Sequence, residues 1–197
     1  MKLISLLEKL EYTCLQGSTD QEVKNVIYDS RKVEEGSLFI CIRGAVVDGH
    51  KFVPDVVAKG AKVLIVEEAV EAPEDVTVIL VKDTRYAMAF ISAAYFGYPA
   101  EKLKTIGITG TKGKTTTTYM VKSILENAGY KVGLIGTIEA IIGDKVIPAK
   151  NTTPESYVIQ EYFHEMAEAG CDCVVMEVSS QGLMLHRTQG FAAHKHA

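Results

Sequence analysis

The sequence predicts an α/β fold with a small N-terminal domain and a second domain built on a mainly parallel sheet. Short apolar segments of strand length alternate along the chain with longer amphipathic segments of helix length. Segment 97–105, GYPAEKLKT, has the glycine, proline and charges of a linker. We therefore expect two domains, at residues 1–98 and 104–197.

The N-terminal domain is expected to begin with an amphipathic helix over residues 1–12, because Glu8 and Lys9 interrupt its apolar residues. Apolar runs predict strands at 23–33, 36–44, 61–68 and 76–83. Helices are expected at 52–60, closed by Gly60, and at 85–97, capped by Asp83 or Thr84 and ended by Gly97.

The second domain starts a new strand–helix alternation at Lys104. Strands are expected at 105–109, 131–135 and 173–178, and Gly143-Asp144 indicates a hairpin within 137–149. A helix should run from the glycine-rich loop after 105–109 to Ala128. Another is expected at 154–170, with Thr153 as its cap and Pro154 at its first position.

Composition excludes several classes of protein. The net charge of −4, from 21 basic and 25 acidic residues, argues against a nucleic-acid binder that works by bulk positive charge. No apolar run approaches the roughly 20 residues that span a bilayer. The four cysteines lack the spacing of common zinc or redox motifs, so free thiols in a reducing cytoplasm are expected.

The segment IGITGTKGKTTTTYM, residues 106–120, combines an apolar strand, a glycine-rich turn and a helix start. Unpaired N–H groups and the dipole of a helix N-terminus attract anions. Gly110 and Gly113 allow close approach of a phosphate, Lys114 can reach the outer phosphates, and Thr115 can offer a hydroxyl to magnesium. Ile108 replaces the first glycine of the general P-loop pattern, so the loop is a variant of it. We predict a nucleoside triphosphate site.

A carboxylate supports this prediction. The apolar run CVVMEV, residues 173–178, carries Glu177 near its end, which is where parallel sheets place their ligands. P-loop enzymes hold magnesium with an acidic residue at such a strand end. Glu177 is therefore the expected partner of Thr115 on Mg²⁺.

Four motifs in this order resemble the Mur ligases, and among them the MurE type: YDSRKVEEGSLFICIRG, TGTKGKTTT, NTTPES and MEVSSQGL. The resemblance implies an enzyme of peptidoglycan synthesis. It would use ATP to phosphorylate the D-glutamyl carboxylate of UDP-N-acetylmuramoyl-L-alanyl-D-glutamate. The amine of lysine or diaminopimelate would then attack the acyl phosphate.

The resemblance also implies site residues. Lys114 and Glu177 would be catalytic, and Thr115 and Glu177 would ligate magnesium. ATP would contact Gly110, Thr111, Lys112, Gly113, Lys114, Thr115 and Thr116. The UDP-muramoyl-peptide would contact Ser30, Asn151, Thr152, Thr153, Ser179 and Arg187, and the Gly44–Gly49 loop would border the uridine pocket.

Structural alternatives remain open for several of these residues. Thr153 could serve as a helix cap, Ser30 as a turn residue, and Arg187 as half of a surface ion pair. Leu185 stands where some relatives have a polar residue near the substrate. This position therefore departs from the family pattern.

The resemblance covers the chain up to Arg187, whereas Mur ligases are more than twice as long. We expect a partial central domain, with the carbamylated lysine and the residues that select the amino acid beyond the end. Such a chain should not turn over alone, and residues 104–197 should be less stable than 1–98 or self-associate. A non-catalytic UDP-muramoyl-peptide-binding module and a MurF-type ligase are alternatives; the N-terminal motifs weigh against a folylpolyglutamate ligase.

Overall fold

The computed structural model describes residues 1–44 and 47–191. It divides into two compact units between Tyr95 and Phe96. This division falls just before the segment 97–105 that the sequence indicates as a linker, part of which forms the short 3-10 helix η3, Pro99–Lys102. Among the described residues, no helix has both the length and the apolar character needed to cross a bilayer.

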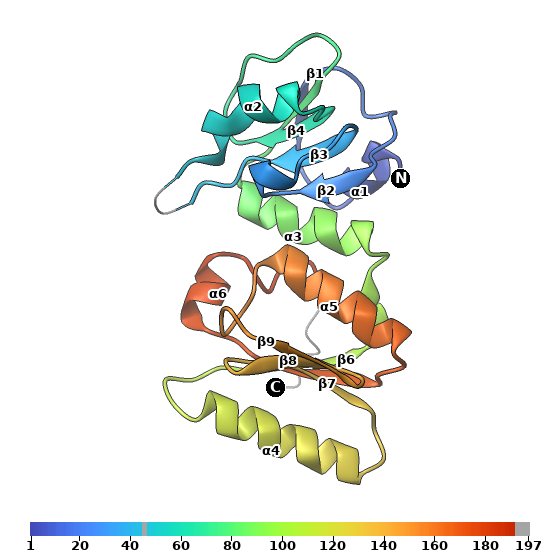
Figure 1. Cartoon of the computed structure of the whole chain (residues 1–197), viewed down its shortest axis with the longest axis vertical. Helices are drawn as coiled ribbons and strands as arrows, with labels where there is room; N and C mark the ends of the chain where they lie inside the picture. The colour runs from blue at the N-terminus through green and yellow to red at the C-terminus, as the bar shows by residue number, and fades with distance from the viewer. Residues whose placement is uncertain (45–46, 192–197) are drawn as a thin grey trace. The chain divides into compact units, whose positions relative to one another are not determined.

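The first unit contains a five-stranded sheet in the order β1-β5-β4-β3-β2. Strands β2 to β5 are parallel, and β1 pairs antiparallel with β5 at one edge. Figure 1 shows α2 and α3 on opposite faces of this sheet. The elements of this unit are α1 Leu3–Leu7, β1 Thr13–Gln16, β2 Asn25–Ile27, η1 Ser30–Lys32, β3 Ser37–Ile40, η2 Gly49–Phe52, α2 Val53–Ala58, β4 Val63–Val66, β5 Thr77–Leu80 and α3 Thr84–Tyr95.

Packing explains the regular elements of the first unit. Strands β3 and β4 are buried along their whole length, which is why they read as continuous apolar runs. Val53 and Val56 of α2 join the core cluster on one face of the sheet. The N-terminus of α3 is held by Asp83, whose carboxylate accepts the Tyr86 N–H, as the sequence predicts.

Two predictions in this unit were wrong in extent, and one strand was missed. The first helix covers only Leu3–Leu7 rather than 1–12, and strand β1 at Thr13–Gln16 was not expected. The predicted strand 23–33 ends at Ile27, because Asp29 accepts the Arg31 N–H and starts η1. Local hydrogen bonds of an aspartate therefore override the apolar pattern there.

The second unit has a five-stranded sheet in the order β6-β10-β7-β8-β9. Strands β6, β10 and β7 are parallel, and β8 and β9 form the expected antiparallel hairpin. In Figure 1, α4 covers one face of this sheet and α5 the other. The elements are β6 Lys104–Ile108, α4 Lys114–Asn127, β7 Val132–Ile135, β8 Glu139–Ile142, β9 Lys145–Pro148, α5 Ser156–Glu168, β10 Cys173–Glu177 and α6 Ser180–Met184.

The start of α5 corrects the predicted cap. The helix begins at Ser156 rather than Pro154, and its N-cap, Glu155, makes no capping hydrogen bond with its side chain. Thr153 is buried and bonds instead to the end of β10, so it is not a helix cap. Helix α6 was not predicted; Ser179 caps it by accepting the Gly182 N–H.

The outer surface of α4 carries exposed apolar side chains, Met120 and Ile124. Strand β6 lies at one edge of the sheet among the described strands. These features agree with the reasoning behind the expected low stability or self-association of the second unit, which stays a prediction. The four cysteines are free thiols, as expected, and only Cys14 is exposed.

Candidate nucleotide and metal site

The glycine-rich loop joins the carboxyl end of β6 to the first turn of α4. Gly110 and Gly113 have φ angles of 149° and 78°, in the region that favours glycine. Gly113 is the N-cap of α4, and a Cβ added to it would meet no atom within 4 Å. The loop residues Gly110, Thr111, Lys112 and Gly113 are all exposed. The loop therefore presents its backbone and the helix N-terminus to solvent, as an anion site requires.

Lys114 and Thr115 begin α4 and point in different directions. The Lys114 amine donates to the Gly110 carbonyl oxygen at 2.8 Å, so the lysine folds back over the loop. The Thr115 hydroxyl donates to Oε2 of Glu177 at 3.0 Å. Thr116, the last residue of the predicted ATP motif, is exposed. The structure thus brings Lys114 to the loop and Thr115 to the predicted metal carboxylate.

Glu177 is the last residue of β10 and is 1% exposed. The register pairs it with Ile108, the last residue of β6, so the loop and the carboxylate leave the sheet at the same edge. Its carboxylate accepts hydrogen bonds from the Thr137 N–H at 2.9 Å, the Thr137 hydroxyl at 3.0 Å and the Thr115 hydroxyl. All three of these donors are uncharged. A buried carboxylate held by neutral donors retains a strong attraction for a cation.

The segment 151–153 contacts Thr137 and the backbone of Glu177 through two threonines. Oγ1 of Thr152 lies 3.1 Å from Oγ1 of Thr137. The Thr153 hydroxyl donates to the Glu177 carbonyl oxygen at 3.0 Å and accepts the Ser179 N–H at 2.9 Å. Asn151 is exposed beside them. These contacts tie the predicted substrate segment to the end of β10.

Arg187 lies next to the same segment. Its Nη1 atom donates to the Thr153 carbonyl oxygen at 2.9 Å, and its Nη2 atom pairs with Glu155 at 2.6 Å. The two side chains are 12% and 22% exposed, so this is a largely buried pair rather than a surface one. Arg187 therefore fixes the start of α5 against the chain that follows α6.

Two residues near the carboxylate were missed from the sequence. The Tyr119 hydroxyl, on α4, donates to Glu139 at 2.8 Å. Burial, and then the Glu139 carboxylate, raise the pKa of Tyr119 to about 12, so it stays protonated as a donor. Thr137, which follows β7, was also missed. Its place after a buried parallel strand is the one signal that the sequence offers, and a threonine is too common at such a place to single it out.

Ser30 lies in the first unit, where it lines a cavity of about 480 Å³ with Tyr28, Ile42 and Phe52. Ser30 also begins η1, so it has a structural role as well. Arg31 holds the pKa of Asp29, another lining residue, at about 2. The predicted bordering loop, Gly44–Gly49, contains residues 45 and 46, which lie outside the described part of the chain.

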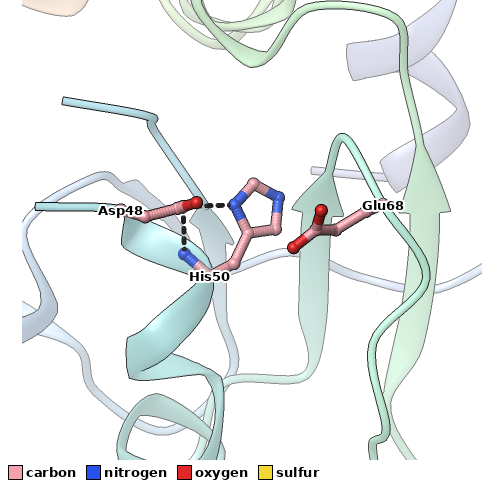
Figure 2. Close-up of side chains that lie close together, drawn as sticks. All are labelled: Asp48, His50 and Glu68. Atoms are coloured by element: carbon pink, nitrogen blue, oxygen red, sulfur yellow. Dashed lines mark hydrogen bonds and ion pairs between the residues drawn. The ribbon is translucent and has the colours of Figure 1, made fainter. Parts of the chain in front are cut away.

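A second cluster, Asp48, His50 and Glu68, has the side-chain types of a metal site (Figure 2). His50 Nδ1 lies 2.6 Å from Asp48 Oδ1, and its Nε2 atom accepts the Glu67 N–H at 2.9 Å. Both ring nitrogens are therefore occupied, which leaves none for a metal ion. Arg43 supplies positive charge by pairing with Glu68 at 2.6 Å. These contacts favour a structural role for the cluster within the first unit.

Comparison with known proteins identifies the family. A family model described as "Mur ligase middle domain" matches residues 108–197, and one described as "Mur ligase family, catalytic domain" matches residues 22–96. The chain belongs to the Mur ligase family. The match to the middle domain includes the glycine-rich loop, Glu177 and the segment 151–153.

Curated Mur ligases are similar over almost the whole chain. The UDP-N-acetylmuramoyl-L-alanyl-D-glutamate–2,6-diaminopimelate ligase of Clostridium perfringens is 53% identical over 96% of this chain and 39% of its own length. The ligase of the same name from Clostridium tetani is 48% identical over 96% of this chain and 40% of its own length. The chain therefore spans about 40% of the length of these relatives.

Solved Mur ligase structures share the fold. A UDP-N-acetylmuramoyl-L-alanyl-D-glutamate–2,6-diaminopimelate ligase matches with a TM-score of 0.77 and 22% identity, over 96% of this chain and 38% of its own. MurF from Acinetobacter baumannii matches with a TM-score of 0.63 and 27% identity, over 91% and 36%. MurF from Thermotoga maritima, solved in complex with ADP, matches with a TM-score of 0.51 and 22% identity, over 80% and 32%.

Proposed function

We propose that this chain forms the nucleotide- and UDP-muramoyl-peptide-binding part of an ATP-dependent ligase of the MurE type. The ligase would add 2,6-diaminopimelate to UDP-N-acetylmuramoyl-L-alanyl-D-glutamate, as the names of the curated relatives suggest. The curated relatives favour this type over a MurF-type ligase, because two relatives with this name are 53% and 48% identical to the chain, whereas the two MurF structures are 27% and 22% identical. The free thiols of the chain would suit a reducing cytoplasm.

The observation that carries the proposal is the contact between the first turn of α4 and the buried carboxylate of Glu177. Thr115 Oγ1 lies 3.0 Å from Oε2 of a glutamate that is 1% exposed and whose three hydrogen-bond donors within the described part of the chain are neutral. Hard oxygen ligands of this kind suit Mg²⁺, which is usually held by one or two protein groups together with substrate phosphates. Thr115 and Glu177 would hold the ion, and it would neutralise charge on the phosphates during transfer.

Lys114 would act on the phosphates from the other side of the loop. In the free protein its amine is bonded to the Gly110 carbonyl oxygen, and it is only half-buried. Exchanging this neutral acceptor for a phosphate oxygen would add the attraction between opposite charges to the hydrogen bond of the ammonium group. The Gly110–Gly113 backbone would provide N–H donors, and Thr111, Lys112 and Thr116 would flank the same anion.

The UDP-muramoyl-peptide would bind at two places. Ser30 would contact its uridine diphosphate part in the cavity of about 480 Å³ in the first unit. Asn151, Thr152, Thr153, Ser179 and Arg187 would contact the peptide part. Of these residues, Thr153, Ser179 and Arg187 already bond to one another's segments, so they would act as a prearranged frame.

Calorimetric titration of the chain with the UDP-muramoyl-dipeptide, and separately with ATP and Mg²⁺, tests the proposal. We expect saturable binding of both ligands. Binding of the UDP-muramoyl-dipeptide without any affinity for ATP would indicate a non-catalytic binding module instead. Absence of both would contradict the assignment of this part of the chain to substrate binding.

A further inference from the structure

Thr137 holds both oxygens of the Glu177 carboxylate. Its backbone N–H donates to Oε1 at 2.9 Å, and its hydroxyl donates to Oε2 at 3.0 Å. One residue therefore fixes the carboxylate at two points, which restricts rotation about the last side-chain bond of the glutamate. Thr115 contacts only Oε2.

The direction of the hydroxyl bonds follows from their chemistry. Thr137 Oγ1 lies close to two oxygens, Oε2 of Glu177 and Oγ1 of Thr152 at 3.1 Å. A hydroxyl has one proton, and a carboxylate only accepts. Thr137 must therefore donate to Glu177 and accept from Thr152, which forms a directed chain from the 151–153 segment to the carboxylate.

The backbone before Thr137 is shaped around the same carboxylate. A Cβ atom at Gly136 would lie 2.7 Å from Oε1 of Glu177, which is too close for a carbon atom. Glycine therefore allows the Thr137 N–H to approach the carboxylate directly. The Gly136-Thr137 pair at the end of β7 is fitted to Glu177, which ends the neighbouring strand β10.

We propose that Thr137 is a positioning residue that orients the Glu177 carboxylate so that its Oε2 atom and Thr115 Oγ1 face one divalent cation. This proposal rests on the proposed nucleotide and metal site. Through Thr152, it also links the orientation of the metal carboxylate to the segment expected to contact the UDP-muramoyl-peptide. In this proposal Thr137 would act through the Glu177 carboxylate rather than by binding the nucleotide or the cation itself.

The test compares nucleotide affinity with and without the cation. ADP is titrated into the 197-residue chain in MgCl₂ and in EDTA, for the native protein, Thr137→Val and Thr137→Ser. The valine removes the hydroxyl but keeps the shape and the backbone N–H, and the serine restores the hydroxyl. Thr117→Val, at an exposed position on α4, is the matched control.

We expect Thr137→Val to reduce the gain in affinity from Mg²⁺ by at least about fivefold, since a hydrogen bond to a charged group is lost. Affinity in EDTA should stay within about twofold of the native value, and the serine and the control should behave like the native protein. The positioning role would be overturned if Mg²⁺ increased the ADP affinity of Thr137→Val as much as that of the native protein. It would also be overturned if Thr137→Val lost as much affinity in EDTA as in MgCl₂, or if Thr137→Ser did not restore the increase from Mg²⁺. If the native chain itself gains nothing from Mg²⁺, the proposed nucleotide and metal site is wrong, and the positioning role falls with it.

Discussion

Thr115 on α4 and Glu177 at the end of β10 are joined by a 3.0 Å hydrogen bond across 62 residues of sequence. The contact exists because β6 and β10 are parallel neighbours and end in register. The loop after β6 therefore turns its first helical residues over the end of β10. This relationship between the two residues underlies the proposed metal site.

Replacement of Lys114 should separate ligand binding from folding. Lys114→Ala should weaken ATP binding by roughly tenfold or more, because it removes a charge-assisted hydrogen bond to phosphate. The free energy of unfolding should change by less than about 0.5 kcal/mol, since the side chain is not buried in the core. Calorimetry and urea denaturation measure the two effects, and Lys102→Ala, at an exposed position in η3, is the control. Equal ATP affinity in both variants would contradict the role of Lys114.

Gly113 and Gly129 offer a matched pair at the two ends of α4. Both have positive φ angles, 78° and 91°, and a Cβ atom at either would meet nothing within 4 Å. Alanine at each position should therefore lower the unfolding free energy by a similar amount, roughly 1–2 kcal/mol. Only Gly113→Ala should weaken ATP binding, because it places a methyl group where the phosphate approaches. Thermal denaturation and nucleotide titration of both variants check this, and a similar loss of ATP affinity in Gly129→Ala would count against it.

Acid should lower the stability of the first unit through protonation of Asp29, which lines the pocket around Ser30. The hydrogen bond from Arg31 lowers the pKa of Asp29 from 3.8 to about 2. A carboxyl group with a lowered pKa stabilises the fold above its usual pKa, and this contribution disappears as the pH falls from 3.8 to 2. Melting curves of the native chain and Asp29→Asn should therefore differ at pH 5 and converge near pH 2. A difference in melting temperature that stays constant from pH 5 to pH 2 would show that the lowered pKa of Asp29 does not contribute to stability.

The Arg187–Glu155 pair should matter more than an exposed ion pair of the same unit. Arg187→Met should cost about 2–3 kcal/mol of unfolding free energy, because it removes the arginine from a largely buried ion pair. Adding Glu155→Gln should recover part of this loss. Lys145→Met breaks the exposed pair with Glu165 and should cost less than about 1 kcal/mol. Urea denaturation measures all three, and equal losses for the two single variants would show that burial is unimportant.

Sequence patterns predicted the parallel sheets well, because buried strands such as β4 and β10 are continuous apolar runs. They also indicated the loop from Gly110 to Lys114, since glycine, lysine and threonine at this spacing are the residue types expected of a phosphate-binding loop. Short helices and strands were harder to predict from the sequence. Helix α6 depends on the Ser179 cap, and β1 on pairing with the distant β5, neither of which produces a periodic pattern.

The candidate site also contains residues that the sequence indicated and residues that it did not. Glu177 could be singled out because a carboxylate that ends a buried strand occurs in the same chain as the glycine-rich loop, and its role as a metal ligand stays a prediction. Thr137 could not, because a threonine after a strand is common, and its role appears only when β7 and β10 are paired. Thr153 was interpreted as a cap from its neighbours, whereas its hydroxyl bonds to a strand that follows 20 or more residues later.

The most direct test of the account is the effect of Mg²⁺ on ATP affinity in the native chain and in Glu177→Gln. The amide keeps the volume of the glutamate but removes the charge that would hold the cation. We expect Mg²⁺ to tighten ATP binding to the native chain at least about tenfold and to have little effect on the variant. An equal gain from Mg²⁺ in both proteins would contradict the central claim that the buried Glu177 carboxylate and Thr115 form the metal site.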